Sequence, residues 1–224
     1  MTRVVIYGGN GFVGSHIAQC LHGKDAQVSC VSRSGKMPEH LVGELWASKV
    51  DWLRGNAGEP DKDLLRQSDV VVTAVGAPPL PTLTKAAYQR SLQTNGLVNQ
   101  QLLHAAGESD VSRAVVIGAK VPAFLDKTWF AYATGKRVTL DAAHAFSQLS
   151  KAHSAVVIQP GGIYGTRHTA GGRPIPLGAV LSPLAKLLPS QLVAVERVAA
   201  CAAAAALGEI AIDNRFSVIS NSQI

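Results

Sequence analysis

The sequence predicts an α/β fold, a doubly wound parallel sheet with helices on both of its faces. Three observations predict it. Short apolar runs alternate with segments of helical length and periodicity along most of the chain. The stretch Asp69–Gly76 holds a continuous apolar run, which is typical of a parallel strand buried on both faces. Finally, the first strand passes into the first helix through a turn with three glycines.

That first unit begins with the apolar strand Val4–Tyr7 and continues into the amphipathic segment Phe12–Leu21. Gly8 permits a tight turn, Gly11 lets backbone N–H groups approach a pyrophosphate, and Gly14 lets the helix pack close to the strand. The positive N-terminal end of the helix faces the phosphates. We therefore expect a Rossmann-type dinucleotide site; a tight turn that binds nothing is the less favoured alternative.

The second strand, Gln27–Ser32, predicts which dinucleotide binds. Sites that prefer NAD carry an acidic residue about 20 residues beyond the glycines, which holds the ribose 2′-hydroxyl. This chain has Ser32, Arg33 and Ser34 there instead. A guanidinium between two hydroxyl donors suits a 2′-phosphate, so we expect NADPH rather than NADH. The alternative is that Arg33 is an exposed turn residue.

The remaining elements follow in order. We expect a helix over Glu39–Ser48, a strand over Val50–Leu53, a short helix around Asp61–Arg66, a fourth strand ending at Ala74-Val75-Gly76, a long helix over Lys85–Ala106, a strand over Ala114–Ile117, a helix over Thr128–Leu149, a strand over Ser154–Gln159, a turn over Pro160–Gly165, an alanine-rich helix over Gln191–Leu207 and a closing strand over Phe216–Ile219. The small residues Ala74 and Gly76 would let an adenine ring and its ribose lie against the backbone.

Residues 166–190 break this alternation. They are rich in Gly and Pro and contain no strong strand. Because ligands bind at the carboxyl ends of the strands in such sheets, we expect this segment to cover the substrate or contact a partner. Its leucines could equally pack on the sheet. The length of 224 residues fits a single domain, residues 1–224, with this segment as a small C-terminal insertion.

Composition excludes several classes of protein. The net charge is +6, but the basic residues are scattered and not interleaved with aromatics, so nucleic acid is not an expected partner. The three cysteines have neither CxxC spacing nor a histidine partner, which predicts reduced thiols and no metal site. No uninterrupted apolar run reaches transmembrane length, so we expect a protein that is soluble or, at most, peripheral to a membrane.

Tyr132 and Lys136 are candidate catalytic residues. They are four positions apart on a predicted helix and so lie on one face of it. A lysine ammonium close to a phenol lowers the pKa of the phenol. Such a tyrosine can exchange a proton with a carbonyl or alcohol oxygen while a nicotinamide transfers hydride.

Four stretches together carry a family resemblance: Gly8–Gly14, Ser32–Gly35, Tyr132 with Gly135-Lys136, and Gln159–Arg167. The chain resembles the atypical, extended-like members of the short-chain dehydrogenase/reductase superfamily. It is similar in particular to mitochondrial and plastid members of that group. They include the dehydrogenase-like protein associated with coenzyme Q biosynthesis and, more distantly, the nucleotide-binding accessory subunit of respiratory complex I.

The resemblance implies roles for individual residues. Gly8, Gly11, Phe12 and Val13 would line the pyrophosphate, Arg33 would meet the adenosine phosphate, Ala74 and Gly76 the adenine and ribose, Lys136 the nicotinamide ribose, and Pro160, Gly161 and Ile163 the carboxamide, while Asn95 would shape the active site. Asn56 stands where an adenine-binding aspartate is frequent. One departure is larger: the expected Ser or Thr after the fifth strand is replaced by Gly118-Ala119-Lys120.

Two functions follow from these residues. The first is an NADPH-dependent oxidoreductase that acts on a small carbonyl or quinone-related compound, with Tyr132 as proton donor and Lys136 beside it. The missing hydroxyl favours the second, a non-catalytic nucleotide-binding accessory subunit of a mitochondrial assembly, either respiratory (complex I-like) or for coenzyme Q biosynthesis. The resemblance implies a mitochondrial location; a soluble cytoplasmic or plastid protein is the alternative.

Overall fold

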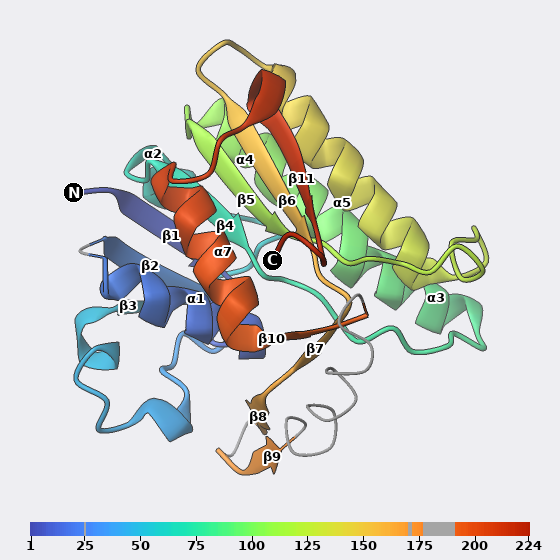
Figure 1. Ribbon diagram of the computed structural model, residues 1–224, viewed down its shortest axis with the longest axis horizontal. Helices are drawn as coiled ribbons and strands as arrows, with labels where there is room; N and C mark the ends of the chain where they lie inside the picture. The colour runs from blue at the N-terminus through green and yellow to red at the C-terminus, as the bar shows by residue number, and fades with distance from the viewer. Residues whose placement is uncertain (25, 170–171, 177–190) are drawn as a thin grey trace.

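A parallel sheet forms the centre of the molecule (Figure 1). The computed structural model describes residues 1–24, 26–169, 172–176 and 191–224. Within these residues the sheet has seven strands in the order β11-β6-β5-β4-β1-β2-β3. They are β1 (Arg3–Tyr7), β2 (Gln27–Ser32), β3 (Asp51–Arg54), β4 (Val70–Thr73), β5 (Arg113–Ile117), β6 (Ser154–Gln159) and β11 (Phe216–Ser220). The predicted doubly wound α/β fold is confirmed, because this order reverses direction between β1 and β4.

Helices cover both faces of the sheet (Figure 1). One face packs against α1 (Phe12–His22) and α7 (Val195–Leu207), and the other against α4 (Val98–Glu108) and α5 (Ala131–Gln148). Strand β1 shows why both faces need cover. Val4 and Ile6 point into the first core and Val5 and Tyr7 into the second, and all four side chains are buried. The short helix α2 (Lys62–Arg66) lies beside α4 and is capped by the Asp61 carboxylate.

The long helix expected over Lys85–Ala106 is present, but a π-helical turn interrupts it. It consists of α3 (Lys85–Leu92), a π-helical turn (Gln93–Leu97) and α4. A Cβ atom on Gly96 in that turn would lie 2.9 Å from the Cα of Gly135 in α5, so the two backbones touch. Asn95 lies in the same π-helical turn, and its side chain is fully buried.

Three sequence predictions of local structure are wrong. Glu39–Ser48 is not a helix but two 3₁₀ turns, Glu39–Leu41 and Ala47–Lys49, separated by Gly43 at φ +97°. The predicted turn Pro160–Gly165 contains a short strand, β7 (Gly162–Tyr164). It pairs in parallel with β10 (Leu192–Ala194), which takes the place of the first turn of the predicted helix Gln191–Leu207. Strands β7 and β10 form because these two segments, distant in sequence, pair with each other. The periodicity of either segment alone does not reveal such pairing.

The segment 166–190 also begins differently from the prediction. Strands β8 (Thr166–His168) and β9 (Pro174–Pro176) form an antiparallel hairpin where no strong strand was expected. The ring of His168 stacks on that of His40, with centroids 3.8 Å apart, and so joins this hairpin to the first 3₁₀ turn. Residues 177–190, which carry all of the leucines of the predicted cover, lie outside the described residues.

Candidate functional site

The glycine turn between β1 and α1 leaves no room for side chains. Gly8 has φ +82°, and a Cβ there would lie 2.9 Å from the backbone of Ala74 at the end of β4. A Cβ on Gly14 would lie only 2.2 Å from the carbonyl oxygen of Gly8. The turn is closed by hydrogen bonds from the Gly8 N–H to the Val31 carbonyl (2.9 Å) and from the Gly11 N–H to the Gly8 carbonyl (3.0 Å). The start of helix α1 is thus packed so closely against the strand ends that Gly8 and Gly14 have no space for a Cβ atom.

The N-terminus of α1 is open to an anion. Gly11 is the N-cap residue and offers no side-chain cap, and the first turn contains no acidic residue. Phe12, Val13 and Gly14 form that turn, and backbone N–H groups at such a position have no partner within their own helix. The positive end of the helix dipole adds to their attraction for a phosphate.

The end of β2 forms a polar, cationic corner. Ser34 accepts a hydrogen bond from the Asn10 amide at 3.1 Å, and Ser32 accepts one from the Gly35 N–H at 3.1 Å. Gly35 has φ +66°, which turns the chain back so that it contacts Arg54 at the end of β3. Arg33 is exposed between the two serines and lines the cavity beside the glycine turn. No residue from Ser32 to Lys36 carries a carboxylate.

Two buried asparagines hold the loop after β4. Asn99 accepts a hydrogen bond from the Thr73 hydroxyl (2.5 Å) and donates one to the Val75 carbonyl (3.3 Å). Asn95 accepts one from the Ala77 N–H (2.9 Å) and donates one to the Ser91 carbonyl (3.1 Å). The predicted adenine-ribose contacts Ala74 and Gly76 lie on this loop. Both amides are nearly or fully buried, so the loop is fixed by bonds that water does not weaken.

Tyr132 and Lys136 share a face of α5, as predicted. The Lys136 ammonium lies 5.7 Å from the centre of the Tyr132 ring. It donates a hydrogen bond to the Ile117 carbonyl at the end of β5 (3.1 Å) and lies 3.6 Å from where a Cβ on Gly76 would stand. Lys136 therefore links the ends of β4 and β5 through α5.

The pKa values of this pair differ from the sequence expectation. Burial lowers the pKa of Lys136 to about 8, because the ammonium loses hydration. Burial also raises the pKa of Tyr132 to about 12, so the expected lowering of the phenol pKa by the lysine is wrong. The Tyr132 phenol is consequently protonated throughout the neutral pH range.

The end of β5 lacks a hydroxyl, as the sequence showed. A Cβ on Gly118 would lie 3.1 Å from a methyl group of Val157 and 3.2 Å from the Ile158 carbonyl. The next two residues are Ala119 and Lys120, and the Lys120 N–H donates to the Pro160 carbonyl (2.8 Å). This backbone bond joins the loop after β5 to the turn after β6.

The turn Pro160–Ile163 is held by the C-terminal part of the chain. The Gly161 N–H donates to the buried Asn221 side chain at 2.7 Å, and the Gly162 N–H donates to the Gln191 carbonyl at 2.7 Å. A Cβ on Gly161 would lie 2.2 Å from that same carbonyl. The predicted carboxamide contacts Pro160, Gly161 and Ile163 thus lie on a turn whose position depends on residues 191 and 221.

A cavity of about 530 Å³ is lined by the glycine turn, the end of β2, the turn after β3 and the loop after β4. Among the predicted cofactor residues, its lining includes Gly8, Gly11, Ser32, Arg33, Asn56, Ala74 and Gly76. The Asn56 side chain accepts a hydrogen bond from the Gly58 N–H (3.0 Å), which shapes the turn after β3. The other predicted residues lie outside this lining: Phe12, Val13, Gly14, Ser34, Asn95, Tyr132, Lys136, Pro160, Gly161 and Ile163. Lys136 still reaches its edge, through its proximity to Gly76.

Sequence reasoning missed the residues that hold the site without facing a ligand. They are Asn10, Thr73, Asn99, Gln191 and Asn221. Asn99 could have been found, since it lies four positions after Asn95 on the same predicted helix and so shares a face with it. Asn221 gave no local signal, because its contact with Gly161 spans 60 residues.

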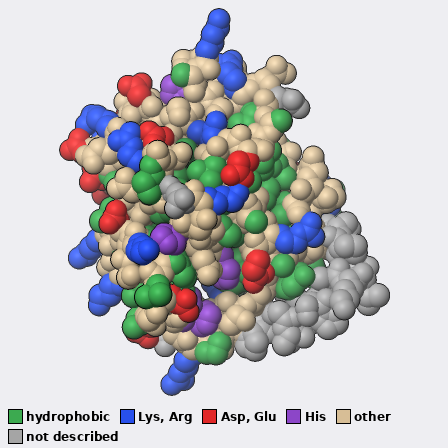
Figure 2. Space-filling view, turned by 60° about the vertical axis from the view of Figure 1, so that its left-hand side comes forward, with side chains coloured by type: hydrophobic (Ala, Val, Ile, Leu, Met, Phe, Trp, Pro, Cys, Tyr) green, Lys and Arg blue, Asp and Glu red, His purple; other side chains and the backbone are tan. Residues whose placement is uncertain are grey.

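The described residues bring together no three His, Cys, Asp or Glu side chains that could hold a metal ion. Their three cysteines are free thiols. Figure 2 shows Lys and Arg side chains dispersed among acidic ones over the face that it presents. In the same described part of the chain, no helix is long and apolar enough to cross a membrane.

Residues 4–179 match the NAD dependent epimerase/dehydratase family. The chain belongs to this family. Its fold agrees with that of the UDP-glucuronic acid 4-epimerase of Bacillus cereus in complex with UDP-glucuronic acid and NAD, with a TM-score of 0.70 and 17% identity. That similarity covers 98% of this chain and 77% of the epimerase. Membership of the family supports a nicotinamide dinucleotide as the cofactor.

Two curated relatives are more similar in sequence. An uncharacterized chloroplastic protein of Arabidopsis thaliana is 32% identical over 194 residues, which are 84% of this chain and 59% of the plant protein. MIOREX complex component 2 of Saccharomyces cerevisiae is 36% identical over 78 residues, which are 33% of this chain and 28% of the yeast protein. The chain therefore spans less than two thirds of the length of either relative.

Proposed function

We propose that this member of the epimerase/dehydratase family is an NADPH-dependent reductase of a small carbonyl or quinone-related compound. The observation that carries the proposal is the continuous surface from the glycine turn to the cationic corner at Arg33. A dinucleotide requires a crowded backbone cradle for its pyrophosphate, and a 2′-phosphate requires positive charge at the adenosine end. This chain offers both, with no carboxylate at the end of β2 to repel the phosphate.

The residues present fit a dinucleotide on structural grounds. Added Cβ atoms at Gly8 or Gly14 would collide with backbone, so these positions are kept clear for a close approach. Gly11 and Phe12 begin a helix without a side-chain cap or an acidic first turn, and an anion supplies what such a terminus lacks. We assign the pyrophosphate to the first turn of α1 and the adenosine phosphate to Arg33, with Ser32 and Ser34 beside it.

NADPH, when bound, supplies the hydride for reduction of a carbonyl carbon. The chain supplies the proton. Tyr132 would hold it on a phenol that is protonated at neutral pH and would give it to the carbonyl oxygen of the substrate. Lys136 is fixed by the Ile117 carbonyl beside Gly76 and would hold the nicotinamide ribose. Asn95 fixes the loop from Gly76 to Ala77 and acts as a positioning residue.

A second candidate is a nucleotide-binding accessory subunit of a mitochondrial assembly. The absence of a hydroxyl at Gly118 and Ala119 favours it, since loss of one donor to a developing oxyanion costs on the order of 100-fold or more in rate. The similarity of one third of the chain to a yeast component of the MIOREX complex also supports it. In that case the dinucleotide stabilises the fold, and no substrate is turned over.

The first test is a fluorescence titration of the purified protein with NADPH and with NADH. We expect tighter binding of NADPH, and a loss of NADPH affinity of about tenfold or more in Arg33→Ala, because a hydrogen bond to a charged group contributes roughly 1.5–3 kcal/mol. NADH affinity should not change in that variant. Lys151→Ala is the matched control, since it removes an exposed positive charge before the amino end of β6, whereas Arg33 follows the carboxyl end of β2.

The second test separates the two candidates. Aldehyde, ketone and quinone panels are added while the absorbance of the reduced cofactor is followed. Consumption of NADPH that is abolished in Tyr132→Phe, with NADPH binding retained, establishes the reductase. Tight NADPH binding without consumption by any compound favours the accessory subunit. Equal affinity for NADPH and NADH in the wild type would refute the assignment of Arg33.

A further inference from the structure

Apolar side chains gather on two loops at one end of the molecule. They are the loop between β4 and α3 and the loop between β5 and α5, which lie around α3 at the right of Figure 1. Leu80 and Leu83 in the first loop are 65% and 94% exposed, and Phe124 and Trp129 in the second are 74% and 64% exposed. Among the large hydrophobic side chains exposed in the described part of the chain, these are four of eleven and include both aromatics.

The two loops are joined to the same helix. The Tyr88 hydroxyl in α3 donates to the Thr128 carbonyl at 2.8 Å, and the Thr134 hydroxyl in α5 donates to the same carbonyl at 3.3 Å. Leu83 immediately precedes Thr84, which caps α3 one turn before Tyr88. Leu83, next to Thr84, and Trp129, next to Thr128, therefore adjoin the residues that join the two loops to the first half of α3. We call Leu80, Leu83, Phe124 and Trp129 the apolar rim.

Backbone hydrogen bonds brace the second loop of the rim. In the second loop the Leu125 N–H donates to the Pro122 carbonyl (2.9 Å), and the Phe130 N–H donates to the Lys127 carbonyl (3.0 Å). Phe130 is itself buried, so the loop has an inside as well as an outside. Apolar side chains lie on both sides of this loop, Phe130 on the buried side and Phe124 and Trp129 on the exposed side. Exposed apolar groups held in this way indicate a partner that covers them.

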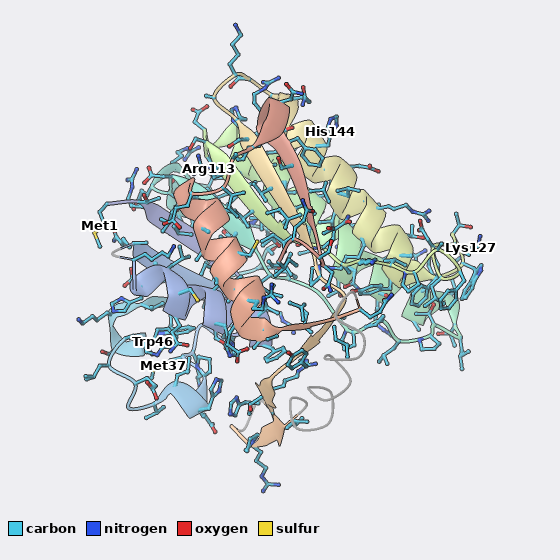
Figure 3. All side chains as sticks on the ribbon, viewed as in Figure 1. Met1, Met37, Trp46, Arg113, Lys127 and His144 are labelled. Atoms are coloured by element: carbon cyan, nitrogen blue, oxygen red, sulfur yellow. The ribbon has the colours of Figure 1, made fainter. Side chains whose placement is uncertain are left out.

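The charges around the rim are mainly positive. Residues 77–90 and 118–130 contain four basic side chains and a single acidic one, Asp126, whereas the whole chain has 21 basic and 15 acidic residues. Asp126 is already paired with Arg137 at 3.2 Å. Lys85 occupies the first turn of α3, where a positive charge opposes the helix dipole. Lys127 extends from the end of this region in Figure 3.

We propose that the apolar rim docks on an anionic lipid surface. Leucine and aromatic side chains would enter the boundary between headgroups and acyl chains, and Trp is a residue enriched at that depth. Lys85 and Lys127 would meet the acidic headgroups, each contributing roughly fivefold to partitioning. Charge complementarity favours lipid over a second copy of this chain, whose own rim would carry the same positive charges. The docked face adjoins α5, at whose N-terminal end Tyr132 lies.

The test is sedimentation of the full chain with vesicles of two parts phosphatidylcholine to one part phosphatidylglycerol, against vesicles of phosphatidylcholine alone. We expect binding to the anionic vesicles that weakens as salt is raised. Leu83→Asp and Phe124→Asp should each lower it about tenfold or more, since each replaces an inserted apolar group by an anion. Leu45→Asp is the matched control: Leu45 is 84% exposed and lies beside Trp46 at the other end of the molecule in Figure 3.

Trp129 provides a second readout. Lipids brominated near the headgroup should quench part of the tryptophan fluorescence in the wild type and not in Trp129→Phe, in which Trp46 and Trp52 remain. Absence of binding to anionic vesicles, or equal binding by Leu83→Asp and wild type, would overturn the proposal. A dimer in light scattering that Leu83→Asp dissociates, without vesicle binding, would assign the rim to a second copy instead. NADPH titration of each variant keeps this result separate from the proposed function.

Discussion

Gly14→Ala is the substitution whose effect follows most directly from the geometry. The new methyl group would lie 2.2 Å from the Gly8 carbonyl oxygen and 2.9 Å from the Cα of Gly9. Both obstacles are backbone, so no side chain can rotate away, and α1 must move from the strand ends. Forcing a methyl group into a packed site costs typically about 1–3 kcal/mol. For a chain of this length that lowers the melting temperature by roughly 2–12 °C.

The same displacement should weaken dinucleotide binding. NADPH at about 100 times its Kd stabilises a protein by about 2.7 kcal/mol, so the wild type should melt several degrees higher with NADPH than without it. We expect Gly14→Ala to lose most of that increase, because the first turn of α1 no longer stands against the glycine turn. The assay is thermal unfolding followed by circular dichroism, with and without NADPH.

Gly23→Ala is the matched control on the same helix. Gly23 has φ −64°, and a Cβ there would lie 3.6 Å from the Cys20 carbonyl, an ordinary contact. Alanine at such a position is neutral or stabilises by about 0.4–1 kcal/mol. If Gly14→Ala matched Gly23→Ala in both melting temperature and NADPH response, the close approach of α1 to the strand ends would not be what this glycine provides.

Two further predictions concern buried polar groups. Lys136→Met should alter the pH dependence of stability. The Lys136 pKa is about 8 in the folded state against 10.5 in the unfolded state, so between these values the unfolded state binds more protons. In urea unfolding, the free energy of unfolding of the wild type should therefore rise relative to that of the variant, by on the order of 3 kcal/mol, as pH rises from about 8 to about 10.5. A constant difference across that range would contradict the burial of its ammonium. Asn95→Ala should lower the free energy of unfolding by about 1–3 kcal/mol, because the Ala77 N–H loses its acceptor, whereas the exposed Gln100→Ala should leave it unchanged. Equal unfolding midpoints for these two variants would show that the Asn95 bond contributes nothing.

The sequence predicted the sheet well because each of its strands carries its own signal. Gln27–Ser32 and Ser154–Gln159 were predicted to the residue, since β-branched runs between turns are local information. The elements outside the sheet are different. Strand β10 exists because Leu192–Ala194 pairs with Gly162–Tyr164, and the 3₁₀ turns replace a predicted helix where Gly43 needs a positive φ. Such features depend on contacts made after the chain has folded.

The site divides in the same way. Gly8, Gly11, Arg33 and Gly76 were predicted, and they line one cavity, because each follows a strand whose carboxyl end points to the same edge. Asn221 could not be predicted, since a hydrogen bond across 60 residues leaves no trace in spacing. Spacing thus identified part of the cavity lining, and only the folded chain shows which predicted residues face the cavity and which other residues hold them there.

Tyr132 and Lys136 show how burial can reverse an expectation drawn from spacing. Four positions on a helix place the two side chains together, and the structure agrees. The lysine, however, directs its ammonium to the Ile117 carbonyl, and burial raises the phenol pKa while lowering that of the lysine. At neutral pH this phenol carries its proton, as an exposed tyrosine would, but its raised pKa also makes it a weaker acid. Because the phenol begins in its protonated form, reduction of a carbonyl needs no prior loss of that proton, and it is the direction in which the site should first be assayed.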